Sequence, residues 1–135
     1  MGEKLKNPPL VEALCEFRFS EDSNWDWILP GQLYDKVGAE FPEHTQFQSI
    51  GLQVQASHKS IPAASIYTAP DRVQYKRSDG SAMIQVGPYL LAINQLKPYT
   101  TWAEFSALII RIYEEYCGIA GNTRIARIGL RYINH

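Results

Sequence analysis

The sequence has few of the residues on which most catalytic and metal sites depend. Its 135 residues include two Cys and three His. It contains no HExxH, GxSxG or CxxC pattern and no glycine-rich phosphate loop, the short motifs that most often indicate chemistry. The sequence therefore predicts no catalytic residue, no metal site and no cofactor, and surface positions for His44, His58 and His135. An active site assembled from distant positions, in a fragment of an enzyme, is an alternative that this argument leaves open.

Long apolar segments are absent as well. No run approaches the roughly 18 to 20 residues that span a bilayer, and residues 1–9 are polar, unlike a signal peptide. We therefore expect a cytoplasmic protein with no membrane partner. Cys15 and Cys117 lie far apart in the sequence, and we expect both to be buried, reduced thiols.

The chain carries almost no net charge. Thirteen Lys and Arg oppose fourteen Asp and Glu, which argues against a general attraction to nucleic acid or to an anionic membrane. The charge is nevertheless uneven, because residues 1–67 carry five Lys and Arg against nine Asp and Glu, whereas residues 68–135 carry eight against five. We expect the two halves to form ion pairs within one fold; head-to-tail pairing of two chains is the alternative.

The first half of the sequence alternates between apolar and polar residues in two segments. Residues 11–19 have the period of a strand with one buried face, and Phe47 to Ala56 repeat that pattern. Between them, Leu33, Val37 and Phe41 predict a helix that starts at Pro30 and stops at Pro42. Residues 57–71, rich in Ser, Ala and Pro, are predicted to form a loop, with a short extended piece at Ser65 to Thr68 as an alternative for that part. The predicted inward residues of the first strand are Val11, Ala13, Cys15, Phe17 and Phe19.

The second half begins with a predicted hairpin. Asp79-Gly80 suits a type I′ turn between residues 72–78 and 81–86, and Gly87-Pro88 predicts a bulge or a break before residues 89–94. Thr101 and Glu104 have capping-box spacing, so a helix is expected from Trp102 to Cys117, ended by Gly118. The last segment, 125–134, is a predicted strand. Its expected inward residues are Ile128, Leu130 and Tyr132.

These elements predict a single α+β domain over residues 1–135. We expect a mainly antiparallel sheet of five to six strands with two helices on one face, in the order β-α-β-β-β-α-β. A duplicated βαββ unit would explain why Ile50-Gly51-Leu52 recurs as Ile128-Gly129-Leu130 at a similar spacing. Chance is the alternative, because short apolar strands often share these residues.

The face of the predicted sheet opposite the helices is polar, and we take it as the candidate recognition face. Gly51 and Gly129 leave gaps among its side chains, where a ligand or a partner backbone can approach. The alternatives are a solvated sheet surface or a ladder of ion pairs between Glu and Arg. The candidate residues are Glu12, Glu16, Arg18, Gln53, Gln55, Arg127 and Arg131.

Several motifs along the chain resemble a sporadically distributed bacterial protein family of unknown function. They are Asn7-Pro8-Pro9-Leu10-Val11-Glu12-Ala13, the Ser78-Asp79-Gly80 hairpin with the strands that follow it, Tyr99 with Trp102 and Phe105, and Gly129-Leu130-Arg131-Tyr132-Ile133-Asn134. The resemblance brings no catalytic residues. Family members are about twice as long, so it implies that this chain corresponds to the N-terminal domain of a longer protein.

These observations favour a noncatalytic binding or protein-interaction module. A protein partner or a homodimer is expected, with dimerisation through an unpaired edge of the last strand. A small-molecule sensor is the second candidate, because Trp25, Trp27 and Trp102 would line its aromatic pocket. Single-stranded nucleic acid is the less favoured third partner, for which Tyr75 and Tyr132 would supply stacking surfaces. The basic residues that motivate it are Arg72, Lys76, Arg77, Arg124, Arg127 and Arg131.

Overall fold

The computed structural model describes residues 11–54, 64–96 and 101–134. For residues 11, 47–54, 64–71, 133 and 134 it describes the backbone alone. Six strands and two helices follow one another in the order β-α-β-β-β-β-α-β. Their bounds are β1 (Val11–Phe19), α1 (Leu29–Val37), β2 (Glu43–Val54), β3 (Ala64–Lys76), β4 (Ala82–Gly87), β5 (Leu90–Gln95), α2 (Trp102–Ala120) and β6 (Ile125–Asn134).

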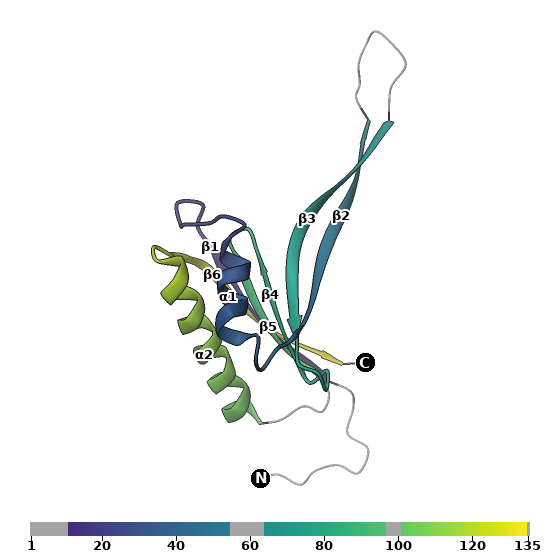
Figure 1. Ribbon diagram of the computed structural model, residues 1–135. Coiled ribbons are helices and arrows are strands. Elements are labelled where there is room, and N and C mark those ends of the chain that lie inside the picture. The colour runs from purple at the N-terminus through teal and green to yellow at the C-terminus, as the bar shows by residue number, and fades with distance from the viewer. Residues whose placement is uncertain (1–10, 55–63, 97–100, 135) are drawn as a thin grey trace.

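The six strands form one antiparallel sheet in the order β2-β3-β4-β5-β1-β6. Both helices lie on the same face of it, and the β2–β3 hairpin extends beyond the other strands (Figure 1). The predicted α+β class, with its antiparallel sheet and two helices on one face, is confirmed. Strands β2 and β6 occupy the two edges, so residues predicted to share one face are spread across the full width of the sheet.

The core lies between the helices and the central strands. Ala13, Cys15, Phe17 and Phe19 of β1 are all buried on the helix side, as their alternation predicts. The rings of Phe17 and Tyr113 pack with centroids 4.7 Å apart, which fixes α2 over β1. The largest fully buried side chains are Tyr116, Phe41, Phe105, Leu33, Ile84, Leu91, Ile93, Ile112 and Val86.

The ends of the helices follow from local chemistry. The predicted capping box is present at α2, where the Thr101 hydroxyl accepts from the Glu104 amide and the Glu104 carboxylate accepts from the Thr101 amide. The helix continues through Gly118, which has ordinary helical geometry, and ends at Gly121, whose φ of 78° no other residue type adopts as easily. Helix α1 ends at Val37, earlier than predicted, yet Phe41 remains fully buried beyond it.

The loop predicted at residues 57–71 is wrong from Ala64 onward, where β3 begins, and the extended piece suggested at Ser65 to Thr68 is part of that longer strand. Residues 55–63 lie outside the described chain. Strand β2 likewise starts at Glu43, before the apolar alternation begins. Pro70, which cannot donate a ladder hydrogen bond, lies opposite Gln48 at a shift in the β2–β3 register. It also lies outside the part of β3 that pairs with β4, and so it does not interrupt the strand.

Two tight turns connect the middle strands. At the first, Gly80 has a φ of 75° and donates to the Arg77 carbonyl, whereas Asp79 does not have a positive φ, so the turn is not type I′ as predicted. At the second, the chain reverses over Pro88 and Tyr89, and Tyr89 has a φ of 55°. The interruption expected at Gly87-Pro88 is therefore a hairpin turn, which provides the sixth strand.

The strand order bears on the suggested duplication. Strands β5 and β6, which flank α2, have only β1 between them. Strands β1 and β2, which flank α1, are separated by β5, β4 and β3. The two β-α-β segments are therefore placed differently in the sheet, and their topology does not support a repeat.

Candidate functional site

Five of the seven predicted recognition residues come from two neighbouring strands, β1 and β6. In the register, Glu16 lies opposite Gly129 and Arg18 lies opposite Arg127. A direct ladder of Glu opposite Arg does not form, because the guanidinium beside Glu16 is that of Arg18 on its own strand, at 3.2 Å. Arg127 and Arg131 are exposed on this face. On the register, Arg127 and Arg131 are opposite the residues two after and two before Glu16 on β1, so three Arg positions surround its position on this face.

Gln53 is not part of this group. It lies on β2, opposite Ser65 of β3 and at the other edge of the sheet from β6. Gln55 lies outside the described residues. The predicted face is thus not one site, because β3, β4, β5 and β1 separate Gln53 from Arg127 and Arg131.

A chain of hydrogen bonds that sequence reasoning missed crosses the middle of the same face. The Arg72 guanidinium and the Gln74 amide donate to Gln85 Oε1 at 3.0 and 3.3 Å. Gln85 Nε2 donates to Asn94 Oδ1 at 2.8 Å, and Asn94 Nδ2 donates to Glu12 Oε2 at 2.7 Å. The amide dipoles point one way, from a cation at one end to an anion at the other, so each bond polarises the next.

This hydrogen-bond chain closes the centre of the face to ligands. Gln85 and Asn94 are 8% and 3% exposed, and each amide uses its oxygen and its nitrogen within the chain. Gln74 and Gln85 are directly opposite in the register, whereas Asn94 lies opposite the apolar Met83 and Leu14, so cross-strand matching in the sequence could have indicated only the first step of the hydrogen-bond chain. The centre of the face is structural, and the charged group at β1 and β6 is its accessible part.

The apolar side of β6 differs most from the sequence-based expectation. Ile128, Leu130 and Tyr132 point to the helix side of the sheet, opposite Phe17, Cys15 and Ala13, as predicted. They are nevertheless 56%, 45% and 51% exposed, so the prediction that they are buried is wrong. The neighbouring residues of β1 are at most 6% exposed. Cover by the helices therefore stops at β1.

The position of β6 explains this exposure. It is the last strand of the sheet, and among the described strands only β1 pairs with it. It is ten residues long, contains no Pro, and has its register shift only where Arg18 and Phe19 pair with its first residues. Natural edges usually carry Pro, inward charges or extra bulges that prevent further pairing. From Arg127 onward β6 has none of these on its apolar side.

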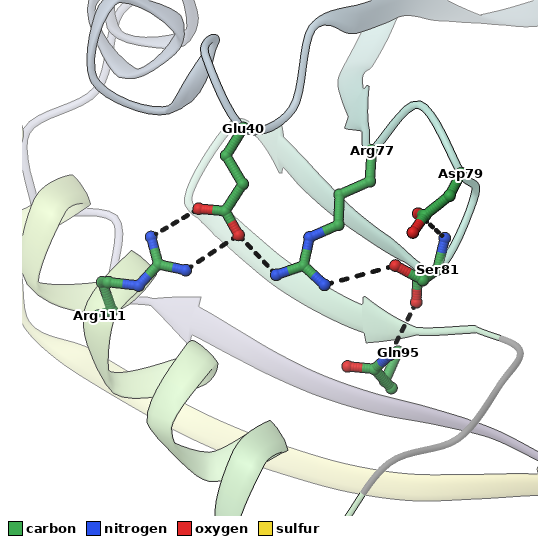
Figure 2. Close-up of polar contacts among 6 residues, drawn as sticks. All are labelled: Glu40, Arg77, Asp79, Ser81, Gln95 and Arg111. Atoms are coloured by element: carbon green, nitrogen blue, oxygen red, sulfur yellow. Dashed lines mark hydrogen bonds and ion pairs between the residues drawn. The ribbon is translucent and has the colours of Figure 1, made fainter.

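A second charged group joins α2 and the turn after α1 to the β3–β4 hairpin (Figure 2). Arg111 binds both carboxylate oxygens of Glu40, at 2.9 and 3.1 Å, and Arg77 binds Glu40 Oε2 at 2.5 Å. Arg77 also lies over the Phe41 ring, 5.1 Å from its centroid. Burial raises the pKa of Glu40, but the hydrogen bonds and charges of Arg111 and Arg77 outweigh it and hold the pKa below its ordinary value.

Ion pairs also connect the acidic first half of the chain to its basic second half. Glu40 pairs with Arg77 and Arg111, and Asp22 pairs with Arg124 at 3.5 Å. Each joins an acid from the first 67 residues to a base from the remainder, as expected for pairing within one fold. The Glu40 group is accounted for by this structural role, because its carboxylate is fully engaged by the two guanidinium groups.

The three tryptophans do not surround one pocket. Trp25 and Trp27 pack edge to face at 5.2 Å in the β1–α1 loop, where Asn24 donates to the carbonyl of Ala120, the last residue of α2. Trp102 is the first residue of the same 19-residue helix. At ~1.5 Å per residue the two ends of α2 are about 27 Å apart. This separation removes the basis of the predicted aromatic pocket.

The aromatic and basic residues that suggested nucleic-acid binding are also dispersed. Tyr75 is buried against α1 and donates to the Pro30 carbonyl at 2.5 Å, and desolvation raises its pKa to about 12. Its ring faces the core, where no base can stack on it. Arg72 and Arg77 are engaged on opposite faces of β3, with Gln85 and Glu40 respectively.

The thiols and the described histidine have no arrangement typical of catalysis. Cys15 is buried, and desolvation raises its pKa to about 11. Cys117 is partly exposed, with its sulfur 3.5 Å from the Thr123 hydroxyl, and His44 is an exposed residue of β2 beside Tyr34. His58 and His135 lie outside the described residues. Within the described ranges, no three His, Cys, Asp or Glu residues gather where a metal ion could bind.

Neither helix of the described chain combines the length and the apolar character needed to cross a membrane. Comparison with protein-family models, with curated proteins and with solved structures finds no match for this chain.

Proposed function

We propose that this chain is a noncatalytic protein-interaction domain whose docking surface is the outer side of β6. We call this surface the β6 edge and define it as the outward backbone of residues 127–132 with the side chains of Ile128, Leu130 and Tyr132. The observation that carries the proposal is the half-exposed state of these three side chains on an edge strand.

The physical argument starts from the two kinds of group that the edge offers. An edge strand has a row of outward amides and carbonyls, and these pair readily with another extended segment. Alternate side chains then supply specificity, because every second residue faces the same way. On β6 those residues are large and apolar, and their burial by a partner is favourable at about 25 cal/mol per Å².

The charged group behind the β6 edge adds direction to the docking. Arg127 and Arg131 are exposed on the opposite side of the strand, next to Glu16 and Arg18 of β1. A partner strand with acidic residues at matching positions gains ion pairs there, whereas a basic partner is repelled. The recognition residues expected on β1 and β6 therefore belong to the same docking surface, on its polar side.

The proposal also covers the cellular compartment of the chain and its family membership. Both cysteines are free, which suits a reducing compartment such as the cytoplasm. The motifs in the sequence suggest membership of the bacterial family of unknown function that they resemble, and we retain that membership as part of the proposal.

Selection of displayed peptides on the purified chain tests this function. We expect the selected peptides to be extended, with apolar residues at every second position, and to lose binding to Ile128→Lys and Leu130→Lys. Both substitutions replace an exposed side chain on an edge strand, so the fold should survive them. Ile110→Lys is the matched control, because Ile110 is equally exposed but lies on α2.

Peptides that bind both edge variants as well as the unaltered chain would contradict the proposal. The same holds if the Ile110→Lys control loses binding to the same extent, since the binding site would then lie on the helix. Thermal melting of each variant shows that a lost interaction does not reflect unfolding.

A further inference from the structure

We propose that the partner of the β6 edge is the β6 edge of a second copy of this chain, in an antiparallel pairing centred on Leu130. The inference rests on the proposed function and names its partner. It makes a continuous sheet across two molecules, related by a two-fold axis that passes beside Leu130.

The apolar residues of β6 match one another in this register. Leu130 lies opposite Leu130 of the second copy, and Ile128 lies opposite Tyr132 of the second copy. Directly opposed side chains of this kind stabilise antiparallel pairs, the more so when one is aromatic and the other β-branched. Residues 127–133, the segment that keeps a regular register with β1, are symmetric about Leu130. All three half-exposed apolar side chains thus gain an additional contact across the axis.

The charges on the other side of the strand support the same register. Arg131 of the second copy lies opposite Gly129, which has no side chain and has open space where one would begin. Directly behind Gly129, on β1, is Glu16. The guanidinium group can therefore extend over Gly129 toward this carboxylate, two strand spacings or about 10 Å away between backbones. The two-fold axis produces this Arg131–Glu16 contact twice.

A second pair of opposite charges follows from the same geometry. Arg127 of the second copy lies opposite position 133, and the residue behind position 133 on β1 is Glu12. Both arginines of one β6 therefore face the two glutamates of the neighbouring β1. This complementarity is local, and it arises although the chain as a whole is nearly neutral.

Neighbouring registers are less favourable. Centring the pair on Gly129 places Arg127 directly opposite Arg131 of the second copy, and centring it on Arg131 places that residue opposite itself; like charges directly opposite destabilise a sheet. Centring it on Ile128 places Leu130 opposite Ala126, where the register with β1 is already disturbed. Only the register centred on Leu130 satisfies both the apolar and the charged side.

Sedimentation equilibrium of the full chain and its charge-reversal variants tests the inference. The chain should form dimers, and Glu16→Arg or Arg131→Glu alone should raise the dimer dissociation constant at least about tenfold, because each creates two repulsive pairs across the axis.

A one-to-one mixture of the two variants should form dimers again, because both contacts then join opposite charges. One contact pairs the two substituted positions, 16 of one molecule and 131 of the other, and the second pairs the unaltered Arg131 and Glu16. Glu114→Arg, an exposed charge reversal on α2, is the control and should dimerise normally.

A chain that stays monomeric at every concentration would overturn the inference, and so would single variants that dimerise normally or a mixture that does not recover. Recovery in the mixture excludes a contact within one molecule, which mixing cannot restore. If the chain is monomeric while selected peptides still require Ile128 and Leu130, the proposed docking function stands and the second copy is not its partner. If dimers form and Leu130→Lys leaves them intact, another surface holds the dimer and the inference fails. The docking function fails as well only if the selected peptides also bind Leu130→Lys unchanged.

Discussion

Burial separates the chemistry of the two thiols. Cys15 lies under α2 with a pKa raised to about 11, so at neutral or mildly alkaline pH almost none of it is thiolate. Cys117 is partly exposed near the end of α2. We predict that a thiol reagent at pH 8 labels one cysteine per native chain and two after denaturation, and that Cys117→Ser abolishes the native reaction. Rapid labelling of Cys15 in the native chain would contradict its burial.

The carboxylate of Glu40 makes stability depend on pH. Its pKa is lower in the folded chain than the ordinary value of 4.5, so the stabilisation is complete above that value and is lost as pH falls toward the lowered pKa. We predict that Glu40→Gln destabilises the chain at pH 7 by no more than about 1 kcal/mol, because a third of the side chain remains in solvent, which screens its ion pairs. Urea denaturation measures the difference.

Measuring the Glu40→Gln variant at low pH provides the control. At acid pH the glutamate is protonated and resembles glutamine, so the two stabilities should converge below about pH 4. A difference that is constant from pH 7 to pH 3 would show that Glu40 acts through packing and not through its charge.

For individual residues, the sequence predicts which face of the sheet a side chain points to better than it predicts how deeply that side chain is buried. Alternation identified which side of the sheet each residue of β1 and β6 faces, because the period of two is a property of the strand itself. It did not separate the buried Cys15 from the exposed Leu130 that lies opposite it. Burial depends on how many layers cover a position, and this depends on strand order across the whole sheet.

Among the connecting elements, two glycines provide a direct comparison. Gly80 has a positive φ in the β3–β4 turn, whereas Gly129 lies in β6 with open space beside its Cα. We predict that Gly80→Ala lowers the unfolding free energy by about 1 kcal/mol, since an L side chain is strained at that φ. Gly129→Ala should leave it unchanged or raise it slightly. Chemical denaturation of both variants measures this, and equal losses would contradict the difference in backbone conformation.

Most elements were predictable because their signals are local. The capping box, the alternation of β1 and the helical spacing of α2 depend on neighbouring residues alone. The second part of β3 was predicted as a hairpin arm, but the continuous strand from Ala64 was not, because Ser, Ala and Pro at 64–70 favour a loop by propensity and pairing with β2 overrides that preference. The hairpin at Pro88-Tyr89 was predicted only as an interruption, because a reversal there requires a positive φ at a tyrosine.

In the molecule as a whole, the position of β6 decides what the surface can do. Among the residues whose side chains the structure describes, Ile128, Leu130 and Tyr132 form a half-exposed apolar stripe on one strand. This strand, β6, lies at an edge of the sheet. The neighbouring β1 carries the glutamates that complement the arginines of β6. The proposed interaction domain uses both features, and the sequence suggested such a domain through the polar face and through the unpaired edge of the last strand.

Disulfide formation between copies tests the central claim most directly. In a Cys15→Ala, Cys117→Ser background, which removes the native thiol directly opposite position 130 in the same chain, Leu130→Cys should form a disulfide-linked dimer under mild oxidation, because the paired Cβ atoms lie about 5 Å apart, close to disulfide span. Ile128→Cys should not, since its counterpart in the second copy is four residues along the strand, about 13 Å away. Efficient linking through Ile128→Cys, or none through Leu130→Cys at concentrations where the chain is dimeric, would contradict the account.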